Sequence, residues 1–115
     1  MVVTVRPTED LLREYTQALL SHGDFAAFFT DDVVATMEGI EPQRFEGRDA
    51  VRTWIEAAHS LGTIRPKSLF ACDTQVGSEW EFVRRDGVVV PYAVVYDVRD
   101  DRISALRLFF TGPLM

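Results

Sequence analysis

The pattern of hydrophobic and polar residues changes its period about halfway along the chain. In the first half, apolar side chains recur every three to four residues, which is typical of amphipathic helices. One such stripe follows Thr8 and stops at Gly23, and another spans residues 51–61 and stops at Gly62. Together with a short helical turn over residues 25–29, the pattern predicts about three helices.

In the second half, apolar and polar residues alternate, which is typical of β-strands. Gly, Pro and Asp residues separate the alternating segments. Strands are predicted over residues 33–38, 67–76, 79–85, 88–98 and 103–111. Helices followed by a meander of strands predict a single α+β domain over residues 1–115.

A hairpin signal allows the pairing of two strands to be predicted. The dipeptide Asp86-Gly87 is typical of a two-residue type I′ turn, which needs positive φ at both positions. In that register Glu81 lies opposite Tyr92, and Glu79 lies opposite Val94. The other face of the hairpin then carries an apolar set: Trp80, Phe82, Pro91, Ala93 and Val95. A bulge at the turn would exchange the two faces.

Composition and charge narrow the classes of partner. Eighteen acidic and twelve basic residues give a net charge of −6, so we expect neither nucleic acid nor a membrane surface as a partner. Cys72 is the only cysteine, which excludes an internal disulfide, and two histidines without nearby acids predict no metal site. The first residues lack a signal-peptide pattern and no apolar run could span a bilayer, so we predict a cytoplasmic protein.

Four segments carry motifs of a known family. They are EYTQALLSHGD at residues 14–24, FTDDVV at 29–34, FEGRDAV at 45–51, and the closing hairpin over 96–110. These segments resemble nuclear transport factor 2-like domains, and most closely their SnoaL-like branch, which includes ketosteroid isomerases, limonene-type epoxide hydrolases and polyketide cyclases. The resemblance implies a cone-shaped fold, in which a curved mixed sheet and helices enclose an apolar pocket.

The resemblance also implies roles for individual positions. The oxyanion-binding tyrosine of the isomerases corresponds to Tyr15, and their second hydrogen-bond donor falls on Tyr92. Their general-base aspartate falls on Met37 or, with a shift of one residue, on Glu38. The last-strand aspartate of the epoxide hydrolases falls on Leu108, so neither set of catalytic acids is complete.

Two carboxylates on one strand suggest a cofactor-free acid–base site. In an apolar pocket, desolvation and mutual repulsion would raise the pKa of one of them. We therefore predict Glu81 as general acid or base, tuned by Glu79, acting on an apolar polyketide- or terpenoid-like compound. Tyr15 and Tyr92 would donate hydrogen bonds to a developing oxyanion. The predicted ligand contacts are Trp54, Met37, Leu108, Phe110 and Val94.

Each candidate also has an ordinary structural explanation. Glu79 and Glu81 suit a solvated edge or the rim of a dimer. Tyr15 suits a core tyrosine whose hydroxyl reaches a backbone group. His22 and His59 suit the C-terminal ends of helices, where a cation is favourable.

Non-catalytic functions therefore stay open beside the enzyme hypothesis. A domain without the usual acids can be a ligand-binding or assembly module that keeps the pocket. Because the outer face of the sheet is also largely apolar, we expect it to form a homodimer. Trp80 and Phe82 on that face could alternatively contact another protein.

Overall fold

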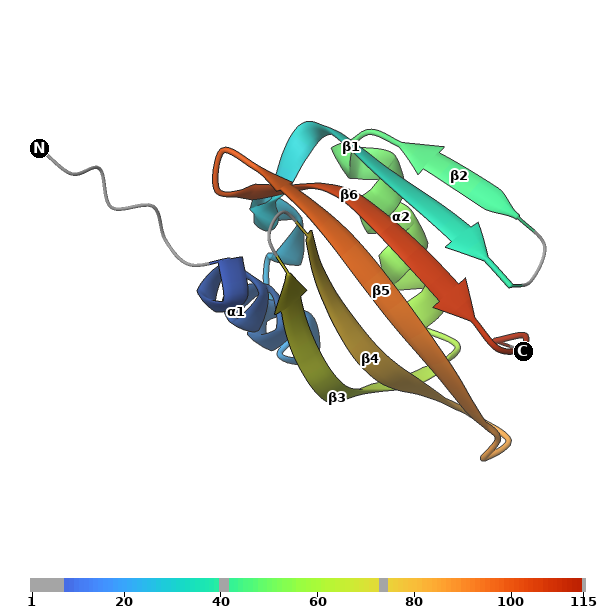
Figure 1. The fold of residues 1–115 in the computed structure, drawn as a ribbon. Helices are drawn as coiled ribbons and strands as arrows, with labels where there is room; N and C mark the ends of the chain where they lie inside the picture. Colours follow the sequence, from blue (N-terminus) through green and yellow to red (C-terminus); the bar gives the residue numbers. More distant parts are fainter. Residues whose placement is uncertain (1–7, 40–41, 73–74, 115) are drawn as a thin grey trace, which may run out of the picture.

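The computed structural model describes residues 8–39, 42–72 and 75–114. Residues 1–7, which carried the expectation about a signal peptide, and the side chain of Cys72 lie outside this part. The described elements, drawn in Figure 1, are α1 (Thr8–Leu20), the 3₁₀ helix η1 (Phe25–Phe28), β1 (Phe29–Glu38), β2 (Gln43–Glu46), α2 (Arg48–His59), β3 (Gly62–Cys72), β4 (Gln75–Arg84), β5 (Val89–Arg99) and β6 (Arg102–Phe110).

The six strands form one mixed sheet in the order β2-β1-β6-β5-β4-β3. Neighbouring strands are antiparallel, except that β1 and β6 run parallel. The sheet is curved, and α1 and α2 both lie on one side of it (Figure 1). Apolar residues of the helices and of the inner sheet face pack into one core. This arrangement confirms the predicted α+β class.

The prediction of about three helices is wrong, since α1 and α2 are the α-helices of the described residues. The segment 25–29 forms only a short 3₁₀ helix, because Phe29 already belongs to β1. Gly62 is the first residue of β3 rather than a helix stop. A Cβ at Gly62 would overlap the Val83 carbonyl oxygen, so close strand pairing explains this glycine.

The end of α1 also differs from the prediction by one residue. His22, rather than Gly23, has the left-handed backbone, with a φ of 58°. The Gly23 N–H donates a hydrogen bond to the Ala18 carbonyl oxygen at 2.8 Å, which closes the last turn of the helix.

The turn between β4 and β5 contains three residues rather than two. The Arg84 N–H donates to the Val88 carbonyl oxygen at 2.9 Å, and the Gly87 N–H donates to the Arg84 carbonyl oxygen at 2.9 Å. Gly87 has a φ of 87°, whereas Asp86 does not have a positive φ. A turn followed by a glycine bulge therefore replaces the predicted type I′ turn.

The extra loop residue shifts the register by one position, so the residues of β4 exchange faces relative to those of β5. Trp80 lies opposite Tyr92, and Glu81 lies opposite Pro91. The predicted pairing of Glu81 with Tyr92 is therefore wrong, and Trp80 and Phe82 are buried rather than on the outer face. The inward-facing residues of the two strands are Val76, Ser78, Trp80, Phe82, Val90, Tyr92, Val94 and Tyr96.

Replacing Gly87 with alanine should lower the free energy of unfolding by about 1 kcal/mol, because alanine adopts the left-handed conformation poorly. A Cβ at Gly87 would meet nothing within 4 Å, so the backbone alone sets this cost. Gly112→Ala is a matched control, since Gly112 has no positive φ. Urea denaturation compares the variants, and equal stabilities would contradict the turn geometry.

Candidate functional site

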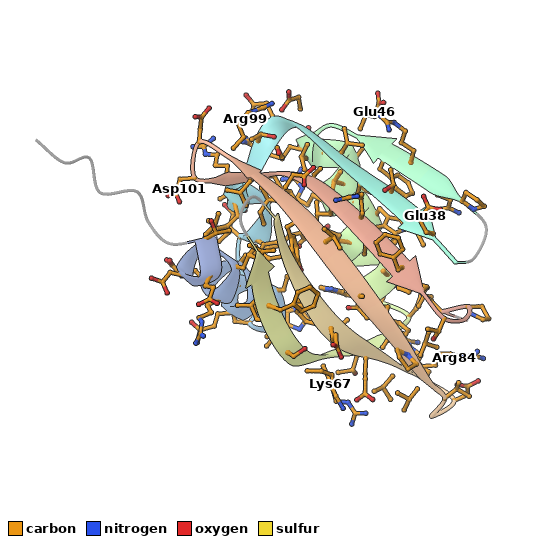
Figure 2. All side chains as sticks on the ribbon, in the orientation of Figure 1. Glu38, Glu46, Lys67, Arg84, Arg99 and Asp101 are labelled. Atoms are coloured by element: carbon orange, nitrogen blue, oxygen red, sulfur yellow. The ribbon has the colours of Figure 1, made fainter. Side chains whose placement is uncertain are left out.

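A cavity of about 50 Å³ lies between the inner face of the sheet and the helices. Charged side chains, such as the labelled Glu46, Lys67 and Arg99, lie around the periphery of the fold in Figure 2. Among the described residues, no carboxylate lines the cavity, whose wall is mostly aliphatic and aromatic. The lining residues that carry polar atoms in their side chains are Tyr15, Trp54, His59, Trp80, Tyr92 and Tyr96.

Three tyrosines gather at this cavity. Tyr15, from the middle of α1, and Tyr96, from β5, are each only 2% exposed. Their ring centroids lie 6.0 Å apart in an edge-to-face arrangement. Tyr92 lies on the same face of β5 and stacks on Trp80 and Phe110, with ring centroids 6.1 and 4.9 Å away. Packing of these rings fixes where the phenol groups lie.

The three hydroxyl groups differ in their partners. Tyr96 Oη lies 3.0 Å from Ser78 Oγ, and Trp80 Nε1 donates to the same Ser78 Oγ at 2.6 Å. Within the part of the chain that the structure describes, the hydroxyls of Tyr15 and Tyr92 have no hydrogen-bond partner. Two donors in one cavity are therefore available to a bound molecule.

Burial raises the pKa of all three phenols. The pKa of Tyr96 rises to about 12, while the pKa values of Tyr15 and Tyr92 rise strongly, mainly through desolvation and secondarily through repulsion from a charge on Tyr96. At neutral pH the three phenols are therefore protonated, and they act as hydrogen-bond donors rather than as bases.

Most of the residues predicted for the site line the cavity. Besides Tyr15 and Tyr92, these are the predicted ligand contacts Trp54, Val94, Leu108 and Phe110. Met37 is not among the lining residues. It is 4% exposed in the core of the sheet, where it pairs with Leu108 of β6.

Glu79 and Glu81 lie on the outer face of the sheet, so the predicted carboxylate site does not form. The Glu81 carboxylate is 3.0 Å from an Arg65 guanidinium nitrogen and 3.8 Å from Lys67 Nζ. Glu79 is exposed and lies opposite Ala93. The glycine bulge is the physical reason, because it reverses the faces on which the alternating residues of β4 lie relative to β5.

His59 is the last residue of α2, and its side chain lines the cavity. Among the side chains that line this cavity, the imidazole of His59 has the ordinary pKa closest to 7. Its ring centroid lies 6.5 Å from that of His22. Burial lowers the pKa of His59, the neighbouring His22 lowers it further, and Glu56 opposes the shift. His59 and Leu19 line both the cavity and a neighbouring surface hollow, so these two side chains lie between the two spaces.

Tyr96 and Ser78 are polar residues of this region that the sequence analysis did not assign. The signal for Tyr96 was its position four residues after Tyr92, which places both on one face of a strand. Ser78 was a lone small polar residue at an inward position of β4, and this signal becomes visible only in the observed register.

Among residues 8–39, 42–72 and 75–114, no three His, Cys, Asp or Glu side chains come together as a set of metal ligands. In the same part of the chain, neither α-helix has the length and apolar character needed to cross a bilayer.

Below about pH 6.5, the protein should lose stability because of His59. The lowered pKa means that unfolded His59 binds a proton more readily than folded His59 does, so acid favours unfolding. His59→Gln removes this titration and should flatten the dependence of the unfolding free energy on pH. Urea denaturation at about pH 7.5 and about pH 5.5 measures the difference. Parallel pH dependences of the wild type and the variant would contradict it.

Comparison with known proteins places this geometry in a family. The SnoaL-like domain family matches residues 12–106. An NTF2-like protein of unknown function from Mesorhizobium loti has a TM-score of 0.78 at 19% identity, with 96% of this chain and 100% of that chain covered. A candidate polyketide cyclase from Xanthomonas campestris pv. campestris has a TM-score of 0.72 at 21% identity, with 89% and 88% covered.

A de novo designed protein with a curved β-sheet also shares the fold, with a TM-score of 0.76 at 18% identity and 89% and 83% of the two chains covered. At such identities, likeness between structures shows the fold alone. Among curated proteins, none matches the chain. Because the family match covers most of the sequence, the chain belongs to the SnoaL-like domain family and has the nuclear transport factor 2-like fold.

Proposed function

We propose that this chain binds a small apolar molecule that carries a hydrogen-bonding oxygen, and that the cavity is its site. The observation that carries the proposal is the pair of hydroxyls of Tyr15 and Tyr92, which have no hydrogen-bond partner among the described residues and lie at a mostly apolar cavity. A ligand oxygen would satisfy these donors, and its hydrocarbon part would contact the aromatic and aliphatic wall. The neighbour from Xanthomonas campestris pv. campestris that is named as a candidate polyketide cyclase supports a small-molecule pocket of this kind.

The size of the cavity restricts the ligand. Its volume of about 50 Å³ is well below the roughly 150 Å³ of a cavity that binds benzene. A polyketide- or terpenoid-sized compound therefore needs a side chain of the wall to move. Trp54 is the candidate, because it is only half-buried and stacks on Phe45, with ring centroids 5.5 Å apart.

Catalysis is a second candidate function, and His59 rather than Glu81 supports it. His59 is the lining residue whose neutral form can accept a proton near pH 7. In such a reaction the imidazole takes a proton from the carbon next to a carbonyl group and returns it to the resulting enolate, while the phenols donate hydrogen bonds to the enolate oxygen.

Cyclopentanone is a suitable probe for both candidates, because it carries one carbonyl oxygen on an apolar ring and, being about the size of benzene, requires only a small movement of the cavity wall. Its titration should shift the NMR signals of cavity residues in a saturable way, and Tyr15→Phe and Tyr92→Phe should each weaken binding by about fivefold. In D₂O, recovery of the unchanged ketone supports binding alone, whereas exchange of its α-hydrogens that is lost in His59→Gln supports catalysis. Absence of saturable shifts in the cavity would contradict both.

We also propose that the chain forms a homodimer through the outer face of the sheet. Phe70 and Phe109 are 47% and 41% exposed there, beside a broad hollow that includes Pro91. The same face carries cations at residues 65 and 67 and acids at 79 and 81. A second copy related by a two-fold axis can therefore place opposite charges against each other.

Substitution of Phe109 tests this dimer. Phe109→Glu should convert a dimer into a monomer, because it buries a charge at the centre of the apolar face. Leu20→Glu is the matched control, since Leu20 is a similarly exposed apolar residue on α1. Light scattering after gel filtration gives the mass, and a monomeric wild type at about 100 μM would contradict the proposal.

A further inference from the structure

Ser78 is a polar residue at an inward-facing position of β4. It is 5% exposed. If aromatic residues are left aside, Ser78 and Thr30 are the buried polar residues in the part of the chain that the structure describes. Its hydroxyl oxygen accepts a hydrogen bond from Trp80 Nε1 at 2.6 Å and lies 3.0 Å from Tyr96 Oη. Trp80 and Tyr96 both line the cavity, whereas Ser78 lines a separate hollow beside α1 and β3, which Trp80 also borders.

The direction of the bond between Ser78 and Tyr96 follows from the protons available. The indole N–H can only donate, so Ser78 Oγ is an acceptor toward Trp80. If Ser78 donates to Tyr96, the free proton is that of Tyr96, a residue of the cavity wall. In the reverse direction, the Ser78 proton has no protein acceptor among the described residues and can turn only toward the hollow beside α1 and β3. A ligand oxygen in the cavity therefore favours the chain of donors Trp80 to Ser78 to Tyr96 to ligand.

Electrostatics distinguishes Tyr96 from the other two phenols. Burial raises its pKa to about 12, but the neighbouring Ser78 and Trp80 donors pull the value down. Tyr15 and Tyr92 have no such donors within residues 8–39, 42–72 and 75–114, and a charge on Tyr96 raises the pKa of both. Tyr96 therefore shares its proton most readily, and successive donors in a chain strengthen one another.

We propose that Tyr96 is a further donor to the ligand, beside Tyr15 and Tyr92, and that Ser78, held by Trp80, is its positioning residue. This inference rests on the proposed binding function and names the ligand class more closely. The chain of hydrogen bonds from Trp80 through Ser78 to Tyr96, here called the relay, leaves the Tyr96 hydroxyl as a donor at the cavity. The site therefore selects a molecule whose oxygen is a strong acceptor, such as a ketone, an aldehyde or an enolate. It discriminates against a hydrocarbon of the same shape, because the donor would then stay unpaired.

The test compares two probes of nearly equal shape, cyclopentanone and methylenecyclopentane, which differ in carrying C=O or C=CH₂. The selectivity is the ratio of their dissociation constants, measured by NMR titration of the full chain. Ser78→Ala should lower the selectivity for the ketone about fivefold, and Tyr96→Phe should lower it at least as much. Ser78→Thr keeps a hydroxyl and should preserve the selectivity. Ser68→Ala, at an exposed serine of β3, is the matched control.

A merely structural role gives a different result, since loss of packing at Ser78 weakens binding of both probes equally and leaves their ratio unchanged. That outcome overturns the relay while leaving the proposed binding function intact. Binding of neither probe by the wild type overturns the proposed function, and a measurement without ligand then decides about the relay.

For that measurement, 3,5-difluorotyrosine replaces Tyr96, and its ionisation is followed by ¹⁹F NMR. Ser78→Ala should raise the pKa of this fluorinated phenol, because the phenolate loses a hydrogen-bond donor. Ser68→Ala should leave it in place. An unchanged pKa in Ser78→Ala overturns the relay, whether or not either probe binds.

Discussion

The three-residue turn over residues 85–87 is the constraint on which the rest of the structure depends. One added loop residue decides which alternate side chains of β4 meet those of β5, and hence which set enters the core. The observed register buries Trp80 and Phe82 and leaves Glu81 beside Arg65 on the outer face. The other register would exchange aromatic burial, worth about 1.5–3 kcal/mol per side chain, for buried carboxylates that cost several kcal/mol each. The turn and the core therefore favour the same arrangement.

Much of the fold could be predicted from sequence, because the spacing of apolar residues in a long segment indicates both its secondary structure and its buried face. The stripes of α1 and α2 and the alternation of β5 and β6 were sufficient for the α+β class. The four residues of β2 carry no such signal, since their burial hardly alternates. The Asp86-Gly87 motif fits both a type I′ turn of two residues and a three-residue turn with a glycine bulge, and in the structure Asp86 lacks the positive φ that the type I′ turn needs. Alternation in β4, with Trp80 and Phe82 inward, was the stronger guide to the register.

The candidate site, like the fold, could be predicted only in part. Tyr15 and Tyr92 could be placed at the cavity by resemblance to the family, whereas the acids assigned to Glu79 and Glu81 depended on the wrong register. What the fold retains is a set of neutral phenols and one imidazole around a small apolar space. Such groups bind and polarise an oxygen atom without a carboxylate, so chemistry at this site depends on donors and on how they are oriented.

Disulfide trapping tests the register most directly. In a Cys72→Ser background, Glu79→Cys combined with Ala93→Cys places two thiols directly opposite each other on the outer face, so oxidation should join them. Glu79→Cys combined with Val94→Cys places them on opposite faces and should leave both thiols free under the same conditions. Mass spectrometry with thiol alkylation counts the free thiols. Trapping of the second pair and not the first would contradict the account.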